Sequence, residues 1–164
     1  MPQTRADQPL AASLLDRLLD DDPSATQELS KTRPQLLRDL KQGVRRDLEN
    51  LLNTRRYCGL WPPRLEQLER SLVGYGIPDI TSTGLGSAAD RDEFRSAVEN
   101  VVRLFEPRFK NVGVEMVDNA EPMDRTLRFR IRALLLSAPA PEPVVFDSSL
   151  QPATGNIEVK GVNR

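Results

Sequence analysis

The sequence predicts an α+β fold in which N-terminal helices pack on a small, mainly antiparallel β-sheet formed by the C-terminal half. Up to Phe105 the apolar residues recur every three or four positions, whereas beyond residue 111 they alternate with polar residues. The first period is typical of helices and the second of strands. Pro107 marks the change, because proline lacks a backbone N–H group and disfavours helical geometry at the residue before it.

The first helix expected along the chain is short and rich in leucine. Over residues 10–20, Leu14, Leu15 and Leu18 lie on one helical face, and Asp20 to Pro23 end the helix. Isolated helices of this length are marginal in water, so the leucine face is expected to dock either on its own domain or on a partner.

The chain is long enough for one domain with its own core. We expect a helical arm and polar linker over residues 1–33, followed by a single α+β domain over residues 34–164. The C-terminal third is rich in proline, so roughly the last 25 residues are expected to be partly irregular.

Three helices are expected in the body. The first, over residues 34–53, has an apolar stripe, and its charged side is expected to be a solvated surface. A shorter one covers residues 65–73, and the third runs from Asp90 to Phe105, with Asp90 capping it and Glu93 reaching back. The charged side of the first consists of Arg38, Asp39, Lys41, Arg45, Arg46, Asp47 and Glu49. The predicted apolar stripes consist of Leu36, Leu37, Leu40, Val44, Leu48, Leu51, Leu52, Leu65, Leu68, Leu72, Val73, Phe94, Ala97, Val98, Val101, Val102 and Phe105.

Strands are expected over residues 112–117 and 125–136, joined by a turn-rich connector, with shorter strands over 144–146 and 156–160. The second is about twice the usual strand length, which suggests that it projects beyond the sheet or extends into a neighbour. Its outward side carries Arg128, Arg130 and Arg132, which we expect to face solvent. The proline-rich run over 138–143 is expected to end pairing, and the last strand is a candidate open edge.

Composition excludes several classes of function. The chain has no histidine and one cysteine, Cys58, which removes catalysis by Ser-His-Asp or Cys-His sets and the histidine-containing zinc sites. No glycine-rich phosphate loop follows a predicted strand. The net charge is −1 with both signs interleaved, which gives no reason to expect nucleic-acid or membrane binding. We therefore expect a cytoplasmic protein without cofactor or metal, since the N-terminus also lacks an apolar signal core.

The Glu106-Pro107-Arg108 corner has two interpretations. It is either a plain helix end with a solvated ion pair, or a rigid charged corner presented to a partner. Local chemistry alone favours the plain helix end, because proline commonly follows helices and exposed ion pairs contribute little to stability.

An ordered series of motifs resembles the TssE family of type VI secretion baseplate wedge subunits, which belongs to a phage-baseplate family sometimes labelled lysozyme-like. The likeness extends from about Ser13 to Leu136, and the Glu-Pro-Arg triplet is its signature. The motifs are Ser13-Leu14-Leu15-Asp16-Arg17-Leu18, Asp47-Leu48-Glu49-Asn50-Leu51-Leu52-Asn53-Thr54-Arg55-Arg56, Tyr75-Gly76-Ile77-Pro78-Asp79, Glu106-Pro107-Arg108 and Leu127-Arg128-Phe129-Arg130-Ile131.

The resemblance implies a structural subunit that joins the wedge subunits TssF and TssG through the corner and starts polymerisation of the sheath, with TssK as a further possible partner. A sheet edge at 112–117 or 156–160 would then accept a strand of the first sheath subunit. The partner-binding residues that we assign are Glu106, Pro107, Arg108, Leu14, Leu15, Leu18, Arg128, Arg130 and Arg132.

Two other interpretations stay open. The family label suggests a peptidoglycan hydrolase with Glu106 as general acid, but glycoside hydrolysis needs a second carboxylate, and none is marked in the sequence. Arg108 nearby would also lower the pKa of Glu106, which is the wrong direction for an acid at neutral pH. The third interpretation is an unrelated adaptor whose leucine arm binds one partner.

Overall fold

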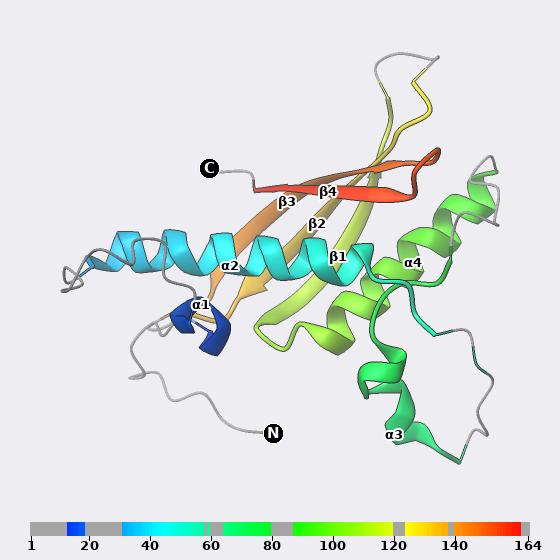
Figure 1. Cartoon of the computed structure of the whole chain (residues 1–164). Coiled ribbons are helices and arrows are strands. Elements are labelled where there is room, and N and C mark those ends of the chain that lie inside the picture. The colour runs from blue at the N-terminus through cyan, green and yellow to red at the C-terminus, as the bar shows by residue number, and fades with distance from the viewer. Residues whose placement is uncertain are drawn as a thin grey trace.

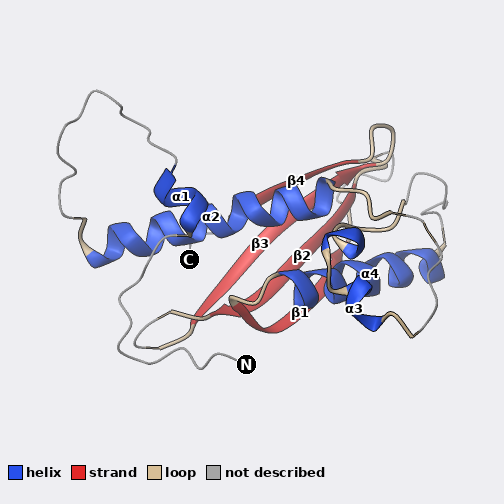
Figure 2. Ribbon diagram, turned by 60° about the horizontal axis from the view of Figure 1, so that its bottom comes forward, coloured by secondary structure: helices blue, strands red, loops and turns tan. Residues whose placement is uncertain are grey.

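The computed structural model describes residues 13–18, 31–57, 59, 64–79, 87–119, 124–137 and 140–161. These residues form two layers, with the two long helices, over residues 33–53 and 88–105, on one face of a four-stranded antiparallel sheet that follows them in the chain (Figure 1, Figure 2). This is the α+β arrangement predicted from the sequence. Within the described part of the chain, no helix is long and apolar enough to cross a membrane.

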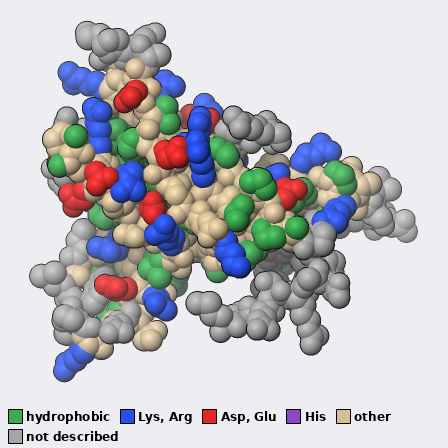
Figure 3. Space-filling model, turned by 180° about the vertical axis from the view of Figure 1, so that it is seen from behind, with side chains coloured by type: hydrophobic (Ala, Val, Ile, Leu, Met, Phe, Trp, Pro, Cys, Tyr) green, Lys and Arg blue, Asp and Glu red, His purple; other side chains and the backbone are tan. Residues whose placement is uncertain are grey.

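The sheet follows the chain, with β1 (Phe109–Val117), β2 (Leu127–Leu135), β3 (Glu142–Gln151) and β4 (Asn156–Gly161) each antiparallel to the next. The predicted alternation in β2 is confirmed: Phe129 and Ile131 are buried against the helices, and Arg128, Arg130 and Arg132 point to the other face. These arginines lie on the face of the sheet opposite the helices. Figure 3 shows the molecule from behind relative to Figure 1, with this face toward the viewer.

Two expectations about the strands are wrong. β2 has nine residues and is paired along its whole length by β3 and from Arg128 to Leu135, across a bulge, by β1, so it does not project beyond the sheet. β3 has ten residues, although only 144–146 were expected as strand. Pro143 is tolerated because it lies at the end of β3 that β4 does not reach, where one side of the strand is an edge. The chain is therefore regular sheet over 142–151 and 156–161.

The helix α2 spans Arg33–Asn53 and lies along β4, while α4 spans Ala88–Phe105 and lies along β1. Most of each apolar stripe is buried, while Leu36, Leu37, Ala97 and Phe105 are half-buried. Phe94 of α4 meets Phe129 of β2, with ring centroids 5.4 Å apart. The buried helical positions are Leu40, Val44, Leu48, Leu51, Leu52, Phe94, Val98, Val101 and Val102.

The cap of α4 lies three residues earlier than expected. Ser87, not Asp90, is the N-cap: its Oγ accepts the Asp90 N–H (3.1 Å), and the Asp90 carboxylate accepts the Ser87 N–H (3.2 Å). The chemistry is the predicted capping box, but Asp90 takes the third helical position that had been assigned to Glu93.

The helix expected over 65–73 is wrong in extent and burial. The structure has a single turn, α3 (Glu66–Glu69), followed by a 3₁₀ turn, η1 (Leu72–Gly74). Leu65 and Leu72 are 42% and 89% exposed. Ser71 interrupts the helix by bonding the N–H of Val73 (3.2 Å), because a serine side chain competes with backbone hydrogen bonding.

β1 contains a bulge at Asn111, where the pairing register with β2 shifts between Lys110 and Gly113. Asn111 has a φ of 51°, a left-handed conformation that asparagine adopts more readily than most residues. Because the bulge inserts one extra residue, Phe109 and Val112 both face the core.

Side chains of α2 occupy the outer edge of β4. The Asn53 amide bonds both backbone groups of Ile157, donating from Nδ2 to its carbonyl (2.7 Å) and accepting its N–H at Oδ1 (2.8 Å). Arg45 Nη1 donates to the Val159 carbonyl (3.1 Å), and Glu49 Oε1 accepts the Val159 N–H (3.5 Å). We call Arg45, Glu49 and Asn53 the α2 clasp.

The α4 helix protects β1 in the same way. Arg103 Nη2 donates to the Val112 carbonyl (2.9 Å), and Glu99 Oε2 accepts the Val114 N–H (3.3 Å). These two residues form the α4 clasp. The expectation of an open edge is therefore wrong at the middle of both outer strands, because their outward backbone groups already have partners.

Candidate functional site

The predicted corner is a tight turn at the end of α4. The Glu106 N–H closes the last helical turn on the Val102 carbonyl (3.0 Å), and the Phe109 N–H bonds the Glu106 carbonyl (3.1 Å) as β1 begins. Glu106 is only 5% exposed, whereas Pro107 is exposed at the tip of the turn. The chain reversal is thus held by backbone bonds on both sides of the proline.

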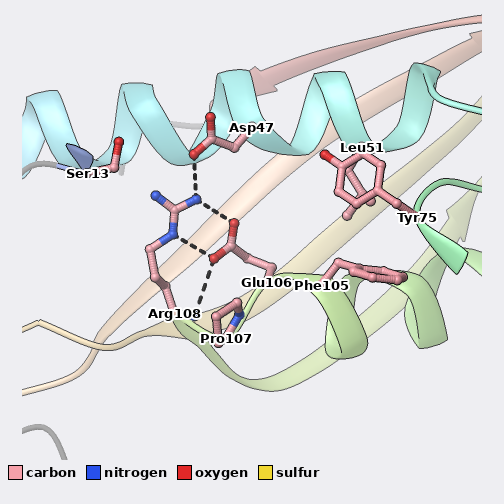
Figure 4. Close-up of a pocket in the computed structure, with 8 residues that line it drawn as sticks. All are labelled: Ser13, Asp47, Leu51, Tyr75, Phe105, Glu106, Pro107 and Arg108. Atoms are coloured by element: carbon pink, nitrogen blue, oxygen red, sulfur yellow. Dashed lines mark hydrogen bonds and ion pairs between the residues drawn. The ribbon is translucent and has the colours of Figure 1, made fainter. Parts of the chain in front are cut away.

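The two charges of the corner bind each other. Arg108 Nε donates to Glu106 Oε1 (2.6 Å) and Arg108 Nη2 to Glu106 Oε2 (2.5 Å), while the Arg108 backbone N–H also reaches Oε1 (3.3 Å) (Figure 4). This is a two-pronged guanidinium–carboxylate pair, the geometry in which such bonds are strongest. A solvated ion pair, as in the plain helix end, is not what the structure shows, because one partner is buried.

Asp47 of α2 joins this pair from across the fold. Its Oδ2 accepts a bond from Arg108 Nη2 (2.7 Å), so a single guanidinium bridges two carboxylates. Burial alone would lower the pKa of Arg108, but the hydrogen bonds and charges of Glu106 and Asp47 raise it above its usual value. Arg108 is therefore a permanent cation that ties α2 to the α4–β1 turn.

The sequence analysis missed Asp47 and placed it on a solvated surface. The available signal was its position, three residues after Val44 and four before Leu51, which puts it at the border of the buried stripe of α2. Other residues of that charged side also have specific partners. Arg45 and Glu49 belong to the α2 clasp, and Lys41 pairs with Glu142 of β3 (2.8 Å).

The same network continues to the N-terminal arm, whose described helix is α1 (Leu14–Leu18). Arg46 Nη2 bonds Asp47 Oδ1 (3.4 Å) on one side and Asp16 Oδ1 (2.5 Å) on the other. Burial raises the pKa of Asp16, but hydrogen bonds from Ser13 and Arg46 outweigh it and leave that pKa below its usual value. Asp16 also lies against Gly43, where an added Cβ would be 2.7 Å from its Oδ2.

The described contacts between the arm and its own domain are made by polar groups. Leu15 is 52% exposed and Leu18 is 81% exposed, and the side chain of Leu14 lies outside the described residues. Within the described part of the chain, the docking of α1 on α2 therefore leaves Leu15 and Leu18 exposed.

A hollow of about 360 Å³ lies between α2, Tyr75 and the corner (Figure 4). The Tyr75 and Phe105 rings meet edge to face, with centroids 5.3 Å apart, and form one wall. Burial, together with the negative charges of Asp47 and Glu106, raises the pKa of Tyr75. The hollow is lined by Ser13, Asp47, Leu51, Tyr75, Phe105, Glu106, Pro107 and Arg108, so it contains the whole predicted triplet.

The three arginines of β2 lie apart from this hollow, on the outer face of the sheet. Arg130 pairs with Asp147 of β3 (2.6 Å) and Arg132 with Glu115 of β1 (2.9 Å). Arg128 pairs with Asp124 (3.1 Å). In Figure 3 basic and acidic side chains are correspondingly mixed on this face.

The geometry supports binding more than catalysis. Both oxygens of Glu106 accept hydrogen bonds from Arg108, so neither is directed at a substrate, as a general acid would have to be. Asp47 supplies a second carboxylate, but the same guanidinium lies between the two, where a sugar would have to bind.

A comparison with protein families matches residues 38–140 to the family described as "Baseplate wedge protein gp25". The match covers more than half of the chain and includes Asp47, Tyr75 and the Glu106-Pro107-Arg108 turn. A search of curated proteins found no match.

Proposed function

The chain belongs to the baseplate wedge protein gp25 family, and from this premise we propose that it is a TssE-type subunit that joins TssF and TssG in a type VI secretion wedge and starts the sheath. A structural role in a baseplate wedge follows from the family itself. The finer assignment is supported by the ordered TssE-like motifs, the first of which, Ser13 to Leu18, precedes the matched region.

The observation that carries the proposal is the turn at Pro107. Glu106, Arg108 and Asp47 fix the turn to α2, so the exposed proline and the hollow beside it form a surface of defined shape. A preformed surface loses little conformational entropy when a partner binds, which suits a joint in a large assembly.

The experiment is co-expression of the chain with TssF and TssG, followed by size-exclusion chromatography. Wild type is expected to elute in one complex with both subunits. Pro107→Ala tests the turn without removing a charge and is expected to weaken the complex, while Pro78→Ala, at an exposed proline outside the hollow, serves as the matched control. Elution of the wild-type chain apart from both wedge subunits would refute the proposal.

The proposal also assigns roles to the remaining predicted residues. Leu15 and Leu18, with Leu14, would supply an apolar contact beside the corner, and residues 1–33 would act as an arm to the domain 34–164. We also propose TssK as a further partner, and a cytoplasmic location for the assembly.

For the sheath, we propose a contact other than the strand addition expected from the sequence. The clasps occupy the middle of both outer edges, so addition of a strand there would require their release. The outer face of the sheet carries no described helix, and Arg128 and Arg132 are about half exposed on it. We therefore propose that the first sheath subunit docks on this face through side chains.

A further inference from the structure

We propose that the hollow beside Pro107 receives a basic side chain, an arginine or lysine, of a wedge subunit. The inference rests on the proposed wedge function, because it names the kind of group that the corner binds. It is argued from the charge, the walls and the unused acceptor of the hollow.

The hollow is electronegative. Its lining contains the carboxylates of Asp47 and Glu106 and the guanidinium of Arg108, so the lining carries one more negative than positive charge. Arg46, outside the lining, contacts Asp47 only at 3.4 Å. The raised pKa of Tyr75, caused by burial and then by these two carboxylates, is consistent with a negative potential at the tyrosine hydroxyl. An acidic group entering here would be repelled by two carboxylates and attracted by a guanidinium that they already share.

Asp47 has acceptor capacity to spare. Its Oδ2 accepts a bond from Arg108 at 2.7 Å, but within the described part of the chain Oδ1 accepts only a long bond from Arg46, at 3.4 Å. The side chain is 28% exposed, so an incoming donor can reach it. A cation bound there would form a charge-assisted hydrogen bond, which is the stronger kind.

The walls suit the stem of a long basic side chain. Tyr75 and Phe105 present aromatic surface and Leu51 aliphatic surface on the side of the hollow away from Arg108 (Figure 4). Pro107 adds aliphatic surface beside Arg108. Lysine and arginine pack their methylene stems on such surface while the charged end meets an acceptor. A cation near an aromatic face gains further attraction.

The first test uses argininamide as the probe, with citrulline amide, whose side chain has nearly the same shape but no charge, as the comparison. In two-dimensional NMR of the full ¹⁵N-labelled chain, argininamide is expected to shift the amide signals of Leu51, Tyr75 and Phe105. Asp47→Asn should weaken argininamide binding about tenfold, because a charged hydrogen bond is replaced by a neutral one. Asp39→Asn, on the exposed end of α2, should leave it unchanged. Equal shifts from citrulline amide, or equal binding by Asp47→Asn, would overturn the inference.

The second test uses co-expressed TssF and TssG. Asp47→Asn and, separately, Tyr75→Leu are expected to lower recovery of the wedge subunits about tenfold relative to Asp39→Asn, with circular dichroism confirming that each variant is folded. If wild type recovers the wedge subunits and folded Asp47→Asn recovers them equally, the basic-side-chain inference is wrong and the wedge function stands. If wild type recovers neither subunit, the wedge function itself is wrong.

Discussion

Glu106 is the most buried of the three residues of the corner. Its carboxylate is buried and is satisfied by Arg108, while Arg108 is itself partly buried and shared with Asp47. Removing one member of such a set leaves the others desolvated without their full complement of bonds. A corner variant can therefore fail in assembly either because it lost a contact to the partner or because the turn itself changed.

We expect Glu106→Ala to lower the stability of the isolated subunit. Breaking a buried ion pair costs about 3 to 5 kcal/mol, which corresponds to a fall in Tm of roughly 6 to 20 °C for a chain of this size. Asp147→Ala, which removes the partner of Arg130 on the outer face, is the control, and its effect should be within about 1 kcal/mol. Equal melting temperatures for the two variants would show that the Glu106 pair does not stabilise the fold.

Tyr75 reports the field of the hollow directly. Because the charge of Asp47 helps to raise the pKa of Tyr75, Asp47→Asn should lower that pKa toward the usual tyrosine value. Ultraviolet titration of the phenolate measures it, and Tyr57, which is 67% exposed, provides an internal reference. No change in the Tyr75 titration would mean that Asp47 does not act on the hollow through its charge.

At the scale of elements, the period of the apolar residues predicted α2, α4, β1 and β2, because each has one buried face whose spacing is visible in the sequence. The bonds that define the site were not predictable in this way. Asp47 and Arg108 are 61 residues apart, and Asn53 and Ile157 are 104 apart, so only the folded chain brings them together. The prediction for Leu72 was wrong for the opposite reason. A local helical period was present, but Ser71 interrupts the helix, and no described residue covers Leu72, which is 89% exposed.

The docking of α1 on α2 should weaken at acid pH. Asp16 has a pKa lowered in the folded state, so its contribution is fully present above the usual aspartate value, near pH 4, and is lost as pH falls through the lower folded value. The Ser13 amide, which donates to Asp16 Oδ2 (3.3 Å), is the probe. Its NMR shift should titrate below pH 4 in wild type and should lose this dependence in Asp16→Asn.

Gly43→Ala separates the arm from the helix on which it docks. The new Cβ would lie 2.7 Å from Asp16 Oδ2, so the carboxylate must move, while alanine favours α2 by about 0.5 to 1 kcal/mol. We expect the Tm to stay constant or rise and the Ser13 amide to exchange faster with solvent. Unchanged exchange of that amide would show that the arm adapts without leaving α2.

At the scale of the whole molecule, the helices both cover the core face of the sheet and protect its edges. The two clasps use side chains one turn apart on each helix, so a single rigid packing arrangement satisfies the core and the edge backbone together. An antiparallel sheet with uncovered edges would offer unpaired N–H and C=O groups to other chains. The arrangement leaves the outer face of the sheet as the large surface without a described helix.

Opening the α2 clasp should expose an edge. In Asn53→Ala the backbone groups of Ile157 lose both partners, and pairing with the β4 edge of a second copy would restore them. We expect concentration-dependent dimers by analytical ultracentrifugation. Asn50→Ala, at an exposed position on the same helix, is the control. A folded Asn53→Ala variant that stays monomeric at high concentration would indicate that Arg45 and Glu49 are sufficient to protect the edge.

The same two surfaces distinguish how the sheath begins. If the first sheath subunit docks on the outer face, Arg128→Ala combined with Arg132→Ala should block sheath assembly while the wedge still forms, because each arginine is about half exposed and its removal costs the fold little. Arg38→Ala, on the helical side of the molecule, is the matched control. Polymerisation of sheath subunits on purified wedges, followed by electron microscopy, gives the readout. Normal sheaths from the double variant, together with altered assembly from Asn53→Ala, would instead place the contact at the β4 edge. The clasp would then have to open before a sheath strand could pair there.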